Sequence, residues 1–579
     1  MHITNLTVRK RLLVALITAI FLFLGIFTRF FYIQVVWGKQ LRQKAVDQWT
    51  RDLPITADRG LITDCNGNVI VNNVTAYTVY VRAKNVVDAD KVSTILSQHL
   101  NIDYDRIYSK VTDKSSSEWT IKRQVSADTV SALREYNLEG VYYATQSVRN
   151  YVYGDFLTQV LGFVSVDSVG QTGIEAYYDK YLSGIDGALL TQSDLVGKEL
   201  YDTSMQYVAP IDGFTIQLTI DCIIQQIVEN VLKVAMQAHS PKHVQCVVLD
   251  VTNGQILAMA QNPSYNLNDI PRDDISTLME LSRNTIITDI YEPGSTFKVL
   301  TAAATLEESR KGNPKAFDEN HVFTNNSDVR YLDGTKIKCW TKHIGNKHAN
   351  QTLAMALNHS CNPIFTDIAL ALGTQTFYGY LQAFGYGSKT GVDFLGEQAG
   401  LLVDEQSVTV NDLARIGFGQ TIAVTALQLA VATAACVNGG YLYQPYFVKQ
   451  IIDPVTGNVV KTMYPTLINR PISQETSKLL ATMLQGVVTE GSGKQAYIEG
   501  YQVGGKTGTA QKYVNGAVAT GKNISSFVGF FPASAPKYLC LFIVDEPVGV
   551  TYGSVVAAPY TRMIFQSIID YYDIAPIQP

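Results

Sequence analysis

The amino-acid sequence predicts an α+β protein that is attached to a membrane by a single N-terminal helix. Three observations lead to this prediction. An apolar segment lies near the start of the chain, directly after a basic cluster. Residues 50–210 then mix short strand-like and helical runs with Gly/Asp turns, and residues 213–575 combine long apolar helical runs with strand-like runs. A chain of 579 residues is long enough to form two or three domains with large cores.

The N-terminal apolar segment has the length of a membrane-spanning helix. It is uncharged over residues 12–28 and continues to residue 36 with Arg29 as its only charged side chain. A helix of about 25 residues is ~37 Å long, which is enough to cross a bilayer core. The basic cluster at residues 9–11 favours a cytoplasmic N-terminus. We therefore predict a cytoplasmic segment over residues 1–11 and an uncleaved transmembrane anchor over residues 12–36. A cleaved signal peptide and a buried core helix are the alternatives.

The rest of the chain is predicted to form two domains. Residues 50–210 are interpreted as an elongated, non-catalytic pedestal domain. Residues 213–575 contain an apolar helical run at 422–437 and strand-like runs at 246–249 and 538–544. This pattern predicts an antiparallel sheet flanked by helices. The net charge is −5 and charged residues make up 17% of the chain, so no basic excess indicates a nucleic-acid partner.

Three short motifs stand in one order within the second domain: Ser295-Thr-Phe-Lys298, Ser360-Cys-Asn362 and Lys506-Thr507-Gly508-Thr509. Each motif taken alone is weak evidence, because similar tripeptides and tetrapeptides recur at 264–266, 282–284, 389–391 and 534–537. We interpret the copy at 389–391 as a loop, since it lacks the leading glycines and the second threonine. The order and the flanking residues therefore select the three motifs.

The first motif has the spacing of an activated nucleophile. Pro293-Gly294 before a helix-forming run is a helix-start signal, so Lys298 is expected one turn after Ser295 on the same face. Burial disfavours the charged form of a lysine and lowers its pKa. A neutral Lys298 amine could then remove the proton of the Ser295 hydroxyl.

The other two motifs supply the remaining groups of an acyl-transfer site. The Ser360 hydroxyl can pass a proton to a leaving amine, and the Asn362 amide can hold Lys298 and a substrate carbonyl. Lys506, Thr507, Gly508 and Thr509 are predicted to lie on a strand that binds a terminal carboxylate, with glycines allowing close approach of a ligand backbone. The backbone N–H groups of Ser295 and Thr509 are the candidates for an oxyanion hole.

Together with further blocks along nearly the whole chain, these motifs resemble the class B penicillin-binding proteins, of the division or sporulation type. The blocks are residues 59–67, Gly162, 170–175, 182–187, 218–229, 250–264, 283–294, 417–440, 526–532 and 552–559, with Cys65 in place of a usual Arg and Val152 in place of a usual Pro. The resemblance implies a D,D-transpeptidase that cross-links peptidoglycan stem peptides ending in D-Ala-D-Ala through an acyl-enzyme on Ser295. It also implies inhibition by β-lactams, an extracytoplasmic catalytic domain at the cell membrane, and a membrane glycosyltransferase as partner.

Three other functions stay open at this point. A β-lactamase or β-lactam sensor shares the first and third motifs but does not resemble residues 50–210. A D,D-carboxypeptidase would use water in place of the acceptor amine. An inactive scaffold of a wall-synthesis complex would not need the full set of catalytic residues.

No cofactor and no metal are expected from the motifs. The seven cysteines do not form a disulfide pattern, and Cys222, Cys246, Cys436 and Cys540 lie in apolar runs that indicate core positions. One cluster leaves a second hypothesis open, because five possible ligands fall within 23 positions: Cys339, His343, His348, His359 and Cys361. The hypothesis is a zinc site made by the two cysteines and one or two of the histidines. The spacing matches no standard zinc pattern, so the favoured interpretation is a free core thiol near scattered loop histidines.

Overall fold

A computed structural model describes residues 5–41, 50–192, 206–324, 327–343, 348–514 and 517–577 of the chain. The chain forms two compact units. One unit comprises residues 1–58 and 184–212, and the other comprises residues 59–183 and 213–579.

The first unit contains the apolar helix and a small sheet. Helix α1 (Asn5–Phe31) continues into a π-helical turn, η1 (Tyr32–Val36). Residues Val8–Val36 are the one helical segment of the described chain that is long and apolar enough to cross a membrane, with a mean hydropathy of 2.4. Strands β1 (Thr50–Ile55), β6 (Gly187–Gln192) and β7 (Gln206–Val208) form an antiparallel sheet in the order β1-β6-β7. The helix begins before the predicted residue 12, because the basic cluster is itself helical.

The N-terminal part of the second unit contains a long antiparallel pair of strands. Strands β3 (Val69–Val81) and β5 (Val141–Tyr151) pair antiparallel along their length, and β4 (Trp119–Val125) pairs with the other edge of β3. Helices α3 (Ala89–Leu100), α4 (Tyr104–Thr112) and α5 (Ala127–Glu135) pack on these strands around a small apolar core. Strand β2 (Ile62–Thr63) extends the sheet and pairs in parallel with β8 (Thr215–Leu218), so the sheet includes strands from both sides of the boundary predicted at 210–213.

A buried network of ion pairs joins Arg59, Arg149, Glu175 and Asp179. Glu175 is fully buried, and its two carboxylate oxygens accept hydrogen bonds from Arg59 Nε and Arg149 Nε, each at 2.6 Å. Arg59 also donates to Asp179, at 2.7 Å, so two guanidinium groups are balanced by two carboxylates. Because buried charges are stable only when paired and hydrogen bonded, this network requires all of its members.

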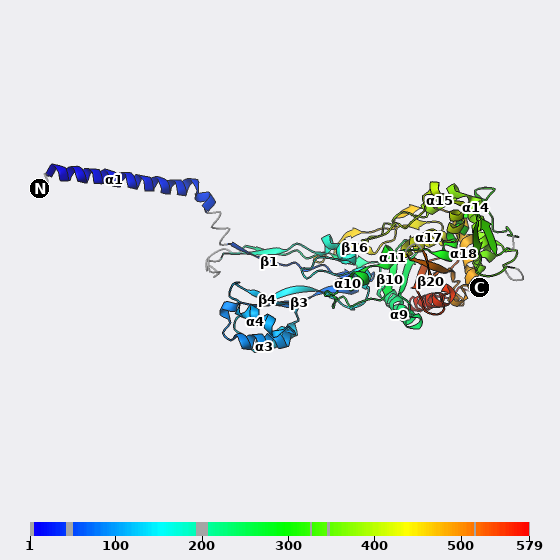
Figure 1. Cartoon of the computed structure of the whole chain (residues 1–579), viewed down its shortest axis with the longest axis horizontal. Helices are drawn as coiled ribbons and strands as arrows, with labels where there is room; N and C mark the ends of the chain where they lie inside the picture. Colours follow the sequence, from blue (N-terminus) through cyan, green and yellow to red (C-terminus); the bar gives the residue numbers. More distant parts are fainter. Residues whose placement is uncertain are drawn as a thin grey trace. The chain divides into compact units, whose positions relative to one another are not determined.

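A five-stranded sheet of the unit is antiparallel and has helices on both faces, as the sequence predicts (Figure 1). Its order is β10-β9-β21-β20-β19, with β9 (His243–Asp250), β10 (Ile256–Asn262), β19 (Gly504–Val514), β20 (Ala517–Phe531) and β21 (Tyr538–Asp545). Alternate side chains of β9 enter two different cores. Cys246 and Val248 pack with α9 (Cys222–His239) and α20 (Ala558–Tyr571). Val247 and Leu249 pack in the core that contains α12 (Lys298–Arg310), α17 (Ala426–Val437) and α18 (Gln474–Thr489).

The predicted core positions of the cysteines are largely confirmed. Cys246, Cys436 and Cys540 are buried, and the sulfurs of Cys246 and Cys540 lie 3.5 Å apart on neighbouring strands. Cys222 is only half-buried, because it occupies the first position of α9. All seven cysteines are free thiols.

Candidate active site

Ser295 lies in a tight turn that leads into a buried helix. The turn is a 3-10 segment, η3 (Gly294–Phe297), and the α-helix α12 begins only at Lys298. Gly294 has φ +57°, and a Cβ at this position would lie 3.3 Å from the carbonyl oxygen of Thr509. The turn therefore packs directly against the strand of the third motif, and a glycine is needed for both the conformation and the contact.

Lys298 is fully buried and hydrogen bonded to the second motif. Its Nζ donates to the carbonyl oxygen of Ser360 at 2.8 Å and to Asn362 Oδ1 at 2.7 Å, and it lies 3.2 Å from Ser360 Oγ. Burial lowers the pKa of Lys298 to about 8, although coulombic interaction with Cys339 and Cys361 opposes this shift. A neutral amine has two protons and one lone pair. The two carbonyl-type acceptors can take both protons, which leaves the lone pair to accept a proton from a hydroxyl group.

The second motif is a sharp junction between two helices. Helix α13 (Leu353–His359) is followed by its C-cap Ser360, which has φ +56°, and helix α14 (Asn362–Leu372) has Pro363 in its first turn. The left-handed residue reverses the chain direction, so that the Ser360 carbonyl and the Asn362 side chain both reach Lys298. The Asn362 amide is oriented by its Nδ2, which donates to the carbonyl oxygen of Lys338 at 3.2 Å.

The third motif lies on β19, as predicted, at the edge of the five-stranded sheet. Gly508 allows both β20 and the nucleophile turn to approach closely, because a Cβ there would lie 2.5 Å from Ser526 Oγ of β20 and 2.9 Å from Thr296 Cγ2 of the turn. Lys506 is fully buried, and its Nζ donates to the carbonyl oxygen of Thr507 at 3.3 Å. Burial, and secondarily the charge of Lys298, hold the pKa of Lys506 well below its usual range.

The three motifs meet at one cleft of about 430 Å³. The predicted residues that line it are Ser295, Ser360, Asn362, Thr507, Gly508 and Thr509. The two lysines lie behind the cleft wall. Lys506 is therefore buried behind the cleft and does not line it, which the sequence motif alone does not reveal.

The cleft is also lined by residues that lie outside the three motifs. These are Trp340, His359, Ser492, Tyr552, Gly553 and Ser554. Ser492 Oγ lies 3.0 Å from Thr507 Oγ1, and Gly553 N donates to Thr509 Oγ1 at 3.1 Å. Tyr552-Gly553 belongs to one of the recognised sequence blocks, whereas the small residues around Ser492 carry no comparable signal.

Two of the recurring copies of the motifs have structural functions. Residues 389–391 lie outside helices and strands, as predicted, and the N–H groups of Thr390 and Gly391 bind the Glu397 carboxylate. Asn284 is the N-cap of α11 (Thr285–Thr288). These residues are absent from the cleft lining.

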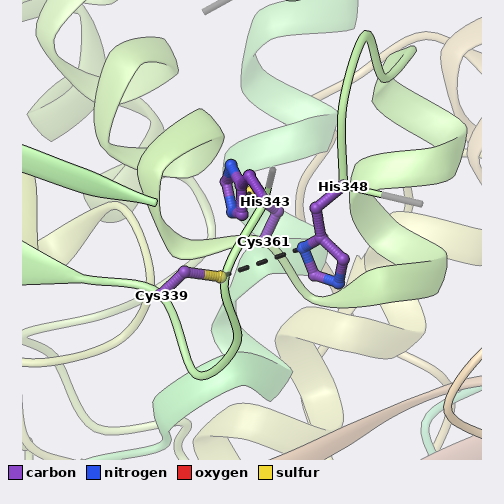
Figure 2. A group of neighbouring side chains, drawn as sticks. All are labelled: Cys339, His343, His348 and Cys361. Atoms are coloured by element: carbon purple, nitrogen blue, oxygen red, sulfur yellow. Dashed lines mark hydrogen bonds between the residues drawn. The ribbon is translucent and has the colours of Figure 1, made fainter. Parts of the chain in front are cut away.

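A cluster of cysteines and histidines adjoins the second motif. The ligand atoms of Cys339, His343, His348 and Cys361 all lie within 4.8 Å of one another, and all four residues are buried (Figure 2). The expectation that these histidines are scattered over a loop was therefore wrong. His359 lies beside the group, with its ring stacked on that of His348 at a centroid distance of 4.9 Å.

Comparisons with known proteins agree with this architecture. The family profile of the penicillin-binding protein transpeptidase domain matches residues 244–569, and that of the penicillin-binding protein dimerisation domain matches residues 54–218. Stage V sporulation protein D of Bacillus subtilis is 38% identical over 100% of this chain and 88% of its own length. The peptidoglycan D,D-transpeptidase FtsI of Escherichia coli is 28% identical over 94% of this chain and 89% of its own length.

Two solved structures show the same fold. A peptidoglycan synthetase from Bifidobacterium adolescentis has a TM-score of 0.72 at 24% identity. The match covers 92% of this chain and 98% of the other chain. Penicillin-binding protein 2X from Streptococcus thermophilus has a TM-score of 0.71 at 23% identity. The match covers 91% of this chain and 80% of the other chain.

Proposed function

The chain belongs to the penicillin-binding protein transpeptidase family, and on this basis we propose that it is a peptidoglycan D,D-transpeptidase with Ser295 as its nucleophile. One observation carries the assignment of residues. A fully buried lysine one turn after Ser295 is hydrogen bonded to both polar residues of the second motif, at the wall of a cleft whose opposite side is the β19 strand.

In the first half-reaction, Ser295 Oγ attacks the carbonyl carbon between the two D-Ala residues of a stem peptide. The lone pair of neutral Lys298 takes the hydroxyl proton. The resulting oxyanion is stabilised by the backbone N–H groups of Ser295 and Thr509. When the C–N bond breaks, the Ser360 hydroxyl relays a proton to the leaving amine, and D-Ala departs.

In the second half-reaction, an amine of a neighbouring stem peptide attacks the acyl-enzyme and restores Ser295. The hydroxyl groups of Thr507 and Thr509 line the cleft and can donate to the terminal carboxylate of the donor peptide. Lys506 lies behind this wall and adds positive potential when it is protonated. Penicillin-type β-lactams would acylate Ser295 in the same way, and the ester would persist.

The N-terminal helix anchors the protein to a membrane. We place the catalytic unit outside the cytoplasm, because the basic cluster before the helix favours a cytoplasmic N-terminus. A membrane glycosyltransferase that makes the glycan strands is the proposed partner. The similarity to a protein named for stage V sporulation supports a sporulation or division function.

The test is intact-protein mass spectrometry after brief exposure to a penicillin, on wild type and Ser295→Ala. We expect an adduct of one drug mass on wild type and none on the variant. No adduct with the drug intact would indicate an inactive scaffold. No adduct with the drug hydrolysed would indicate a β-lactamase.

A further inference from the structure

Four side chains with the chemistry of zinc ligands converge at one buried point beside the second motif. Cys361 Sγ lies 3.6 Å from His343 Nε2, and Cys339 Sγ lies 3.9 Å from His348 Nδ1. Their exposed fractions are 0% for Cys361, 1% for His343, and 4% for both Cys339 and His348. Figure 2 shows the side chains pointing toward one another from separate segments.

Hydrogen bonding alone does not account for this group. The Nδ1 atom of His343 is buried and has no hydrogen-bond partner among the described residues. The ring therefore contacts the cluster through its other nitrogen, Nε2, which faces Cys361 Sγ. Two thiols and two imidazoles that are buried together in an apolar core are an unusual arrangement unless they bind a common ion.

We propose that Cys339, His343, His348 and Cys361 bind one zinc ion in a closed tetrahedral site. With the usual Zn–S and Zn–N bond lengths, a tetrahedral site places sulfur and nitrogen ligands about 3.6 Å apart, close to both measured separations. Two thiolates neutralise the charge of Zn²⁺, so the complete site can be buried without a net charge. Four protein ligands leave no open position for water, so the ion is structural and takes no part in the chemistry.

The chain neighbours of the ligands connect this site to the cleft. Cys361 lies between Ser360 and Asn362, the two residues that hold Lys298 Nζ. Cys339 follows Lys338, whose carbonyl oxygen accepts the Asn362 amide, and precedes Trp340, which lines the cleft. A metal bound to both cysteines would therefore fix the second motif and the Trp340 wall with respect to each other.

The hairpin that carries Cys339 has few other attachments to the core. Strands β12 (Val329–Leu332) and β13 (Thr335–Lys338) contribute only Ile337 to the buried apolar residues. Arg330 forms a bidentate ion pair with Asp367 of α14, at 2.8 and 2.6 Å. This pair holds one end of the hairpin, and the zinc ion would hold the end that faces the active site.

The first test measures metal in the full-length protein, purified in detergent without chelator. We expect about one equivalent of zinc for wild type and its loss in Cys339→Ala and His348→Ala. Cys436→Ala removes a buried thiol far along the chain from the cluster and should retain the metal, as should Ser295→Ala. Apo protein titrated with Co²⁺ alone should develop visible d–d bands and thiolate charge-transfer absorption, which the ligand variants should lack.

The second test separates the structural function of the ion from metal binding itself. Removal of zinc by a chelator should lower the melting temperature and slow penicillin acylation of Ser295 by on the order of 10- to 100-fold, because misplaced catalytic groups lose rate steeply. Restoring Zn²⁺ should recover both. This readout depends on the proposed function, whereas the metal content does not.

Several results would overturn the proposal. Less than about a tenth of an equivalent of zinc in wild type would exclude the site, as would iron in its place. A protein lighter by two hydrogens with Cys339 and Cys361 linked in one peptide would show a disulfide instead. Stoichiometric zinc whose removal changes neither melting nor acylation would refute the connection to the second motif.

Discussion

The side-chain nitrogen of Lys298 lies 2.8 Å from the carbonyl oxygen of Ser360, which joins the start of α12 to the junction between α13 and α14. A carbonyl oxygen can only accept, so this contact orients one N–H of the amine whatever its protonation state. Asn362 Oδ1 orients a second N–H. The geometry of the base is thus set by a motif that lies more than 60 positions further along the chain.

Asn362→Ala should slow penicillin acylation by on the order of 100-fold, because Lys298 loses one of its two fixed acceptors and its lone pair is no longer directed. Stopped-flow or quenched mass spectrometry measures the rate constant. The matched control is Asn266→Ala, in the recurring copy of the motif at 264–266, which should acylate as wild type. Equal rates for both variants would remove Asn362 from the mechanism.

The acylation rate constant should rise with pH, with an apparent pKa of about 8. Burial lowers the pKa of Lys298, and only the neutral amine can accept a proton, so the active fraction grows as pH increases through this value. The measurement is the acylation rate between about pH 6 and pH 9.5. Lys537→Ala, in the copy at 534–537, should keep the profile. A rate that is flat across this range would mean that Lys298 is not the base.

Gly508→Ala should impair both stability and acylation. The new Cβ would lie 2.5 Å from Ser526 Oγ of β20 and 2.9 Å from Thr296 Cγ2 of the nucleophile turn, so both neighbours must shift away from it. Overpacking of this kind costs about 1–3 kcal/mol of unfolding free energy. Thermal melting and adduct formation measure the two effects. Gly379→Ala is the control, because its Cβ meets no atom within 4 Å in helix α15 (Thr374–Ala383), and it should be neutral or stabilising.

Glu175→Gln should destabilise the region around β3 without touching the cleft. The substitution leaves two buried guanidinium groups facing a neutral amide, which costs about 3–5 kcal/mol in comparable buried pairs. Melting temperature is the readout. Asp167→Asn breaks the exposed pair with Arg123 and should change stability by less than about 1 kcal/mol. A wild-type melting temperature for Glu175→Gln would contradict the assigned importance of the network.

Local sequence features predicted much of the fold correctly. The long apolar N-terminal run forms a helix, and the apolar runs at 246–249 and 538–544 lie in β9 and β21. These features depend on neighbouring residues alone, through hydrophobic periodicity. The pairing of β9 with β21, nearly 300 positions apart, depends on long-range packing that a single sequence does not encode in its spacing.

For the candidate site too, the sequence predicted some features and only the tertiary structure determined the others. The sequence predicted the types and the order of five site residues: Ser295, Lys298, Ser360, Asn362 and Lys506. This was possible because acyl transfer needs these groups in short, recognisable motifs. The sequence did not predict that Lys506 lies behind the cleft wall or that Ser492 lines the cleft. It raised the convergence of two histidines with Cys339 and Cys361 as a hypothesis but could not select it over scattered histidines. Those relationships arise where segments distant in sequence pack together. The sequence therefore specified which chemical groups this protein has, and the packing of its sheet and helices determined which of them meet and how deeply each is buried.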